Sequence, residues 1–442
     1  MTTGLSKIQE EVTPSEMESS VLSKITRRIV PLLFVLYLVA YLDRINVAFG
    51  ALQMQRELHF SDSVYGLGAG IFFIGYLLFQ VPSNLMLQRV GARRWICVLM
   101  IVWGCISVST AFITSIRSFY LLRFLLGSAE AGFFPGIIFY IRGWFPTAVR
   151  ARTVALFMTA GPLSAVVGGP VSGVLLGLHG VARFAGWQWL FLLEGLPAVF
   201  LGVVVFFYLS DAPGEAQWLS SSERVWLAGT LGREPRSLKG SSLAAFRSGA
   251  VWLLALALFG VTTCTSGLSL WLPTLIHSLS TSSNLTIGIL YALPYVAAAL
   301  AEFLVGLHSD RTGERRWHVG VPALTGAIAI VGVAYLTSLA AVLVAVTIAI
   351  LSSYATFGPF WAMVASLLEG RTAAAGIALI NSVGNLGGFW GPYVIGFVRN
   401  VTGTFRGGFL VAAVTLALCG VIVLTLRLEP IGRGFSQGTV AT

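Results

Sequence analysis

Apolar segments of about 20 residues recur along nearly the whole chain, and this repetition limits the possible folds more than any other feature. They fall near 29–52, 64–87, 96–115, 117–141, 152–177 and 188–209, and again near 249–273, 284–307, 319–337, 339–366, 372–398 and 407–427. Each is long enough to cross a bilayer as a helix. Because 56% of the 442 residues are hydrophobic and 10% are charged, too few polar side chains remain to cover a soluble core. The sequence predicts an all-α integral membrane protein with twelve transmembrane helices in two six-helix halves.

Polar segments divide the chain and set its orientation. We predict a tail at 1–28, a first half at 29–209, a central loop at 210–248, a second half at 249–427 and a tail at 428–442. The first twenty residues are polar and acidic, which predicts a disordered tail without a cleavable signal peptide. Of the 28 Lys and Arg residues, 21 lie on the side of the N-terminus and 5 in loops on the other side. Since basic residues favour the cytoplasmic side, both termini are expected there. Topology and anionic lipid then account for the net charge of +10 without a nucleic-acid partner.

A short motif occurs once in each half. Arg89, Gly91 and the pair Arg93–Arg94 follow the second apolar segment, and Arg311, Gly313 and the pair Arg315–Arg316 follow the eighth, 222 residues later. Such a repeat indicates that the second half duplicates the first. A binding site is then expected between the halves, near the middle of the membrane.

The motif also carries a family resemblance. Gly306 to Arg316 resembles the inner-loop signature of the major facilitator superfamily, Gly-x-x-x-Asp-Arg-x-Gly-x-Arg-Arg, and the second-half copy is complete. In the first-half copy, Asn84 and Gln88 replace the Gly and the Asp. The segments 123–127 and, for the anion:cation symporter branch, 41–48, 127–136 and 376–388 resemble further motifs. The resemblance implies the major facilitator fold and a substrate among tartrate-like, sugar or phthalate-like acids.

The signature has a physical role that we expect to be conformational. Gly306 would permit close helix approach and Gly313 a turn of positive φ. Asp310 would accept hydrogen bonds from a neighbouring helix end or an arginine, and so brace one half against the other. The positions assigned to this motif are Arg89, Gly91, Gly306, Asp310, Arg311, Gly313, Arg315 and Arg316.

Two adjacent charges, Asp43 and Arg44, interrupt the first apolar segment. At about 1.5 Å per residue from Arg28, both lie about 22–24 Å from the inner face. Tyr37, Tyr41 and Arg44 share one helix face, whereas Asp43 lies about 100° round from Arg44. We therefore expect Arg44 to face a cavity and hold a substrate carboxylate bidentately, and Asp43 to face another helix.

The fourth segment adds Arg123 and Glu130, which are two turns apart on one face. Arg123 lies near the depth of Asp43 and Glu130 near the centre, which predicts an Asp43–Arg123 pair with Glu130 below it. A carboxyl at such a depth can hold a proton when no cation is close, as proton coupling requires. Two alternatives remain: Arg123 as a static brace, and Glu130 as a permanently neutral core residue.

Other side chains complete the predicted site. Tyr41 and Tyr76 would offer hydroxyl groups to the substrate, Asn381 and Asn385 would offer amide groups, and Trp361 would form an apolar wall. The family resemblance supports all of these as cavity positions except Asn385. Glu302 lies outside the family pattern, as either a snorkelling surface acid or an adjunct site.

These features predict a proton-coupled symporter that imports an organic carboxylate by alternating access, as a monomer in the bacterial inner membrane. The alternatives are an uncoupled facilitator or exporter and, more remotely, a transporter-like membrane sensor. We expect no enzyme activity, metal or cofactor, because no nucleophile–base arrangement or cofactor motif occurs. The four cysteines lie within apolar segments and show no metal or disulfide spacing.

Overall fold

The computed structural model describes residues 14–233, 243–368 and 370–426. The first half contains α1 (Pro14–Glu57), α2 (Asp62–Val90), α3 (Ala92–Thr110), α4 (Ile116–Glu130), α5 (Phe133–Trp144), α6 (Thr147–Met158), α7 (Ala160–Leu176) and α8 (Gly186–Tyr208). The second contains α11 (Gly249–Leu279), α12 (Asn284–Thr312), α13 (Arg316–Tyr335), α14 (Leu339–Ala355), α15 (Phe357–Leu367), α16 (Gly370–Thr402) and α17 (Arg406–Thr425). Between them lie the short helices α9 (Ser221–Gly232) and α10 (Leu243–Arg247). The predicted all-α membrane fold is confirmed.

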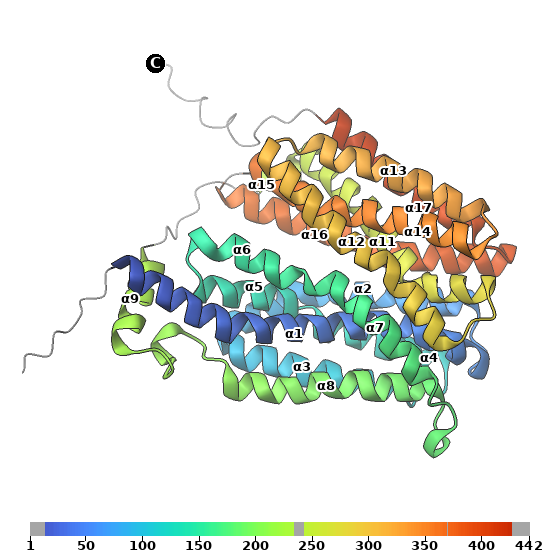
Figure 1. The fold of residues 1–442 in the computed structure, drawn as a ribbon, viewed down its shortest axis with the longest axis horizontal. Helices are drawn as coiled ribbons and strands as arrows, with labels where there is room; N and C mark the ends of the chain where they lie inside the picture. Colours follow the sequence, from blue (N-terminus) through green and yellow to red (C-terminus); the bar gives the residue numbers. More distant parts are fainter. Residues whose placement is uncertain (1–13, 234–242, 369, 427–442) are drawn as a thin grey trace, which may run out of the picture.

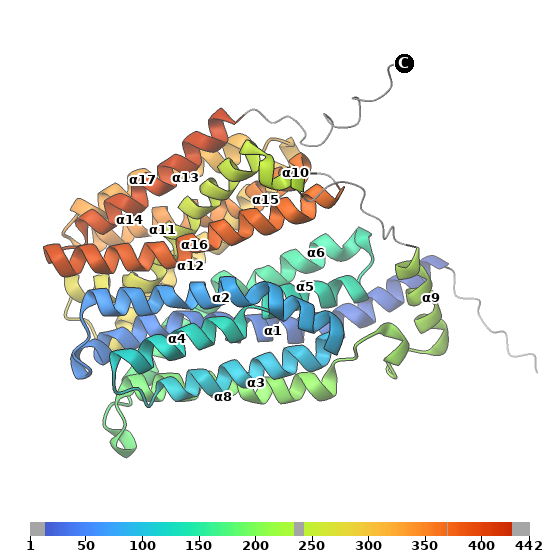
Figure 2. The same ribbon diagram turned by 180° about the vertical axis from the view of Figure 1, so that it is seen from behind.

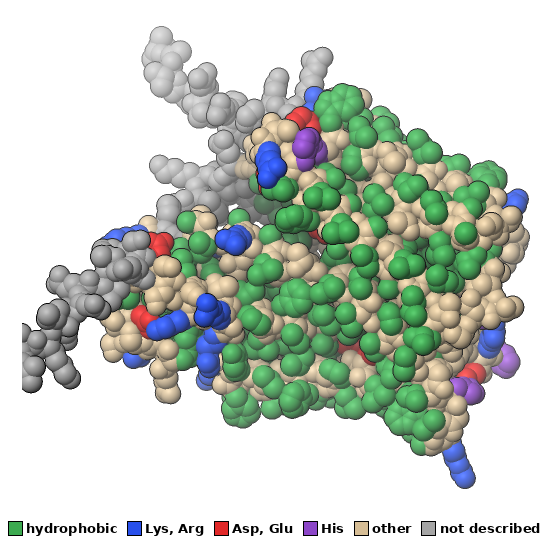
Figure 3. All heavy atoms as spheres, viewed as in Figure 1, with side chains coloured by type: hydrophobic (Ala, Val, Ile, Leu, Met, Phe, Trp, Pro, Cys, Tyr) green, Lys and Arg blue, Asp and Glu red, His purple; other side chains and the backbone are tan. Residues whose placement is uncertain are grey.

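The helices match the predicted apolar segments in order and position. Among the described residues, eleven helical segments are long and apolar enough to cross a membrane. α16 covers the remaining predicted segment, 372–398, and carries Asn381 and Asn385 among several glycines. Figure 3 shows hydrophobic side chains over the flank, with Lys and Arg mostly towards two ends. This is the surface of a protein that lies across a bilayer.

The two halves lie side by side, as both views show (Figures 1 and 2). The start of α1 and the helix α9 lie at one end of the molecule, on the left in Figure 1. We call this the tail end. The opposite end, where α1 meets α2 and α11 meets α12, we call the far end.

α1 begins earlier than the sequence predicts. Its first turns belong to the expected 1–28 tail, while residues 1–13 lie outside the described part of the chain. Val21, Ile25 and Ile29 follow each other at intervals of four and are buried, in one apolar cluster with Leu227 of α9. Burial of this stripe stabilises a helix where composition predicts disorder.

Three predicted helices are interrupted, and each interruption has the same cause. α4 gives way to α5 before Pro135, α6 to α7 before Pro162, and α14 to α15 before Pro359. Proline has no N–H to donate to the carbonyl four residues earlier. Those carbonyls belong to residues 131, 158 and 355, at or next to the ends of α4, α6 and α14. The helix ends freed in this way lie around the site between the halves.

Glycines allow the halves to approach closely. A Cβ at Gly288 of α12 would lie 2.1 Å from the carbonyl oxygen of Gly169 on α7. A Cβ at Gly396 of α16 would lie 2.5 Å from the carbonyl oxygen of Asp62 at the start of α2. Both distances are too short for any larger residue without a shift of the helices. The two helix pairs therefore join the halves backbone to backbone.

Candidate functional site: a cavity between the halves

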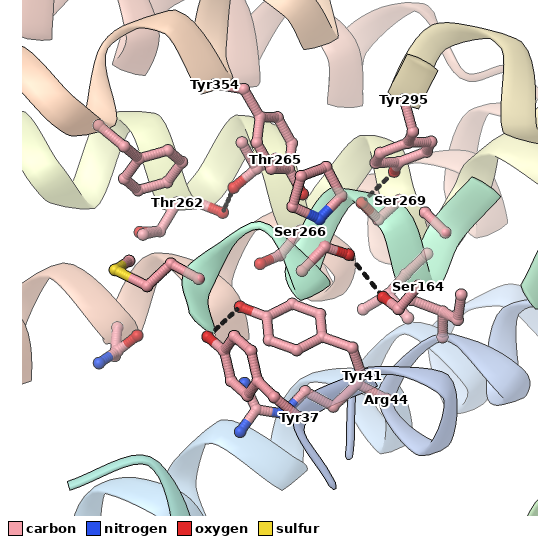
Figure 4. A pocket seen from close by; sticks show the side chains of 18 of the residues that line it. Tyr37, Tyr41, Arg44, Ser164, Thr262, Thr265, Ser266, Ser269, Tyr295 and Tyr354 are labelled. Carbon is pink, nitrogen blue, oxygen red and sulfur yellow. Dashed lines mark hydrogen bonds between the residues drawn. The ribbon is translucent and has the colours of Figure 1, made fainter. Parts of the chain in front are cut away.

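A cavity of about 220 Å³ lies between the two halves. α1, α2, α4, α6 and α7 line it from the first half, and α11, α12, α14, α15 and α16 from the second. In Figure 4, Tyr37, Tyr41 and Arg44 lie on one side, and Ser269, Tyr295 and Tyr354 on the other. The broken helices contribute Met158, Pro162 and Phe357 to its wall. Interrupted helices that meet between two repeats are typical of binding sites in transporters.

The face of α1 predicted to line a cavity does so. Tyr37, Tyr41 and Arg44 all line it, and the Tyr37 hydroxyl donates to the Tyr41 hydroxyl at 3.3 Å. The two rings meet edge to face with centroids 4.8 Å apart. The Arg44 guanidinium lies over the rings of Tyr41 and Tyr76, at 5.0 and 5.1 Å from their centroids. These aromatic faces hold the cation in place.

Arg44 forms an ion pair that crosses from α1 to the end of α4. Its Nε donates to Oε2 of Glu130 at 2.8 Å. The Glu130 side chain is fully buried, whereas that of Arg44 is 19% exposed and borders the cavity. The other Glu130 oxygen, Oε1, has no hydrogen-bond partner in the described part of the chain. Arg44 therefore presents a partly neutralised guanidinium to whatever occupies the cavity.

Asp43 faces away from the cavity, towards α3, as helix geometry predicts. Its Oδ1 accepts hydrogen bonds from the Ser107 hydroxyl at 2.6 Å and from Asn46 Nδ2 at 3.2 Å. Asp43 is fully buried, and its Oδ2 has no partner among the described residues. No sequence signal pointed to Ser107, a small hydroxyl in an apolar helix.

The predicted Asp43–Arg123 pair is wrong. Arg123 instead donates to backbone carbonyls of α2, from Nε to Gly68 at 3.3 Å and from Nη2 to Ala69 at 3.5 Å. Its guanidinium also lies over the Phe72 ring at 5.1 Å. α2 packs closely on α4 and its carbonyls accept hydrogen bonds from Arg123, while Ser107 of α3 donates to Asp43. Counting residues along a helix gave equal depth, but depth says nothing about the direction in which a side chain points.

The remaining predicted substrate residues divide into two groups. Asn385 lines the cavity, and Tyr76 lies buried beneath Arg44. Trp361 and Asn381 are not among the residues that line the cavity, and Trp361 packs against the core with its ring 5.5 Å from that of Phe360.

Sequence reasoning missed a set of hydroxyls. Thr262, Thr265, Ser266 and Ser269 of α11 all line the cavity. Their intervals place them on one face of an otherwise apolar helix, and this stripe was visible in the sequence. Ser164 of α7, with Tyr295 and Tyr354, completes the polar wall. Several of these groups donate to their own helix backbone, so they bring oxygen acceptors as well as donors to the cavity.

The inner-loop motif forms two turns at the tail end. Gly313 has a φ of 68°, as predicted, and Asp310 accepts from Arg315 Nη1 at 2.7 Å. In the first-half copy Gly91 has a φ of 93°, and the missing acid is supplied by Asp211, which lies after α8. Asp211 accepts from the Arg93 backbone N–H at 2.8 Å, a role that no sequence motif indicated. A Cβ at Gly306 would meet no atom within 4 Å, so the close approach expected there is not made in this conformation.

Polar contacts join the halves at the far end. Arg399 of α16 pairs with Asp62 of α2 at 2.7 Å, and Arg56 of α1 lies 2.7 Å from the His277 ring of α11. The Tyr65 hydroxyl donates to the Leu270 carbonyl at 2.6 Å. With the glycine contacts of α7 and α12, these bonds close the far end.

Two helical halves across a membrane with a charged cavity between them define a transporter, a protein class distinct from enzymes. The chain belongs to the major facilitator superfamily, whose family pattern matches residues 33–392 and 283–439. It is 49% identical over 416 residues to a protein of Agrobacterium vitis named "Putative tartrate transporter", covering 93% of this chain and 96% of that one. It is 40% identical over 426 residues to the "Quinolone resistance transporter" of Acinetobacter baumannii, covering 96% and 98%.

Solved structures share the fold. A bacterial homologue of the human lysosomal transporter Spinster superposes with a TM-score of 0.74 at 18% identity, over 89% of this chain and 95% of that one. The predictions of a major facilitator protein, integral and multi-pass in the bacterial inner membrane, are confirmed.

Proposed function

We propose that this chain is a proton-coupled symporter that imports an organic carboxylate anion by alternating access, as a monomer. The observation that supports it best is the contact between Arg44 and Glu130 at the cavity wall, 2.8 Å from Nε to Oε2. Relatives named for tartrate transport support a carboxylate as substrate. In this proposal, Arg44 holds the substrate carboxylate and Glu130 carries a coupling proton.

The pair suggests how the two fluxes are joined. A substrate carboxylate and Glu130 compete for the same guanidinium, which can grip one carboxylate bidentately. When Glu130 takes up a proton, it stops competing and Arg44 becomes free to bind the anion. The pair of Arg44 with Glu130 and the pair of Arg44 with one substrate carboxylate then carry the same net charge of zero. Because a net charge is costly inside a membrane, binding the anion without the proton is disfavoured.

The other predicted residues take supporting roles in this proposal. Asp43, with its unpaired Oδ2, holds a second coupling proton, and Arg123 tunes both acids through its charge. Tyr41 and Asn385 contact substrate beside Arg44, and Tyr76 contributes to the substrate site from beneath the Arg44 guanidinium. Trp361 and Asn381 join the site at another stage of the cycle, when the inner-loop motif around Asp310 braces the halves.

The proposal is tested in proteoliposomes with radiolabelled tartrate and a more acidic outside. The wild type should accumulate tartrate, and Glu130→Gln should lose this accumulation but keep exchange of tartrate for tartrate at equal pH. Arg44→Gln should lose both activities, because the carboxylate ligand is gone. Glu18→Gln, a change at an exposed position outside the cavity, is the matched control. Accumulation against a gradient by Glu130→Gln would show that Glu130 does not carry the proton.

A second candidate is an exporter or an uncoupled facilitator. The relative named for quinolone resistance supports it, since resistance is a property of outward transport. The same vesicles separate the candidates. A facilitator equilibrates tartrate without regard to the pH gradient, and an exporter drives tartrate into vesicles in which the protein is inverted, with its cytoplasmic face on the outside.

A further inference from the structure

We propose that Glu302 is a second substrate contact, which selects organic acids that carry a hydroxyl or ammonium donor in addition to the carboxylate held by Arg44. The inference rests on the proposed function and adds the chemistry of the substrate. It comes from the position of Glu302 in the cavity, which the proton cycle of Arg44 and Glu130 does not use.

Glu302 is turned into the protein and not towards lipid. On α12 it follows Tyr291, Tyr295 and Ala298 at intervals of four, three and four, so all four share one face. Tyr291, Tyr295 and Ala298 are buried, and both Tyr295 and Glu302 line the cavity. The neighbouring positions Leu300 and Phe303, on the other side of α12, are 60% and 66% exposed. Of the two alternatives left open for Glu302, the snorkelling surface acid is therefore wrong.

The charges on the cavity wall are divided between the halves. Three charged residues line it: Arg44 and Arg123 from the first half and Glu302 from the second. Arg44 and Arg123 both have protein partners, the Glu130 carboxylate and the carbonyls of α2. In the described part of the chain, Glu302 makes no hydrogen bond or ion pair. The second half thus offers one carboxylate that is free to accept.

This division constrains the substrate. A carboxylate in a confined site is costly unless a donor reaches it, and a second anion nearby makes it more so. A plain carboxylic acid satisfies Arg44 but brings only negative charge towards Glu302. An acid that also bears a hydroxyl or an ammonium group can bind Arg44 through its carboxylate and donate a hydrogen bond to Glu302. The hydroxyls of Ser269, Tyr295 and Tyr354 can bind its remaining polar atoms. The cavity is therefore matched to a molecule with an acidic and a donor end.

The test is competition in tartrate exchange at equal pH, which does not depend on proton coupling. Unlabelled succinate, tartrate and aspartate compete with labelled tartrate; they share a four-carbon diacid skeleton and differ in donors. In the wild type we expect tartrate or aspartate to compete about tenfold better than succinate, the effect of one hydrogen bond to a charged group. Glu302→Gln should reduce that preference to about twofold or less, and Glu302→Ala should abolish it. Loss of the preference for tartrate over succinate identifies a hydroxyl as the donor. Loss of the preference for aspartate over succinate identifies an ammonium group.

Two outcomes overturn the inference. Equal competition by all three acids in the wild type would show that the cavity does not select for a donor group. An unchanged preference in both Glu302 variants would show that another residue makes the selection. Glu18→Gln serves as the control, and retained exchange of tartrate by each variant shows that it is folded. If the wild type exchanges none of the acids, the proposed function fails and this inference with it; exchange without discrimination refutes this inference alone.

Discussion

The ion pair between Asp62 and Arg399 should hold the far end closed. Asp62 opens α2 in the first half, Arg399 lies near the end of α16 in the second, and Nη1 and Oδ1 are 2.7 Å apart. Their side chains are 24% and 22% exposed. Arg399 also lies 4.3 Å from the Phe405 ring centroid, which restricts its motion. The pair therefore lies between the exposed and the buried class of ion pairs.

Its contribution can be placed between the measured limits. Exposed pairs contribute up to about 1 kcal/mol, and breaking a buried pair costs about 3–5 kcal/mol. For Asp62→Asn, which keeps the shape and removes the charge, we expect a loss of about 1.5 kcal/mol from the closed form. That corresponds to about a tenfold rise in the ratio of open to closed far ends.

The assay is a distance distribution between spin labels on the two halves at the far end. Exposed Thr114, before α4, and Thr281, before α12, are replaced by cysteine in a chain whose four native cysteines have been removed. Asp62→Asn should add a population at longer distance. Asp211→Asn, which breaks the ion pair of Asp211, after α8, with Arg93 at the tail end, should not. Identical distributions for wild type and Asp62→Asn, or an equal change in both variants, would refute the reasoning.

Two further predictions concern stability. Gly288→Ala should cost about 1–3 kcal/mol by forcing α12 from α7, whereas Gly306→Ala, with no atom within 4 Å of the new Cβ, should be neutral or stabilising; thermal unfolding in detergent measures both. Equal melting temperatures would contradict this. At Glu223 in α9, burial raises the pKa, but the bonds from Lys24 and Ser220 outweigh it and leave the pKa below its usual range. Because the folded pKa is lowered, its stabilisation is present above the unfolded pKa of about 4.3 and is lost as pH falls through the folded value. Glu223→Gln should therefore speed hydrogen exchange of α9 about fivefold at neutral pH and less as the pH falls. Exchange that is equally fast in wild type and variant at neutral pH would contradict it.

Hydropathy predicts where helices cross the membrane but not where they end or break. α2 runs from Asp62 to Val90, beyond the apolar segment 64–87, because Ser61 caps its first turn. The breaks before Pro135, Pro162 and Pro359 were not predicted, although each proline is visible in the sequence. Eight other prolines lie inside unbroken helices. A proline weakens a helix everywhere, and the packing around it determines whether the helix ends there.

For the site, the sequence indicated which residues carry charge but not which of them pair. Asp43, Arg44, Arg123 and Glu130 were all singled out, and all are buried or line the cavity. Their partners depend on the rotation of each helix, which is set by the packing of α2 on α4 and of α1 on α7 and α8. The difference has a mechanistic consequence. An unpaired Arg44 would have been free to bind an anion without a proton, as in a uniporter. Because Glu130 engages Arg44, an arriving carboxylate in the proposed cycle displaces another carboxylate, and protonation of Glu130 lowers the cost of that exchange. In the proposed cycle, proton coupling thus depends on the pairing of Glu130 with Arg44, and the presence of acidic residues in the membrane is not enough by itself.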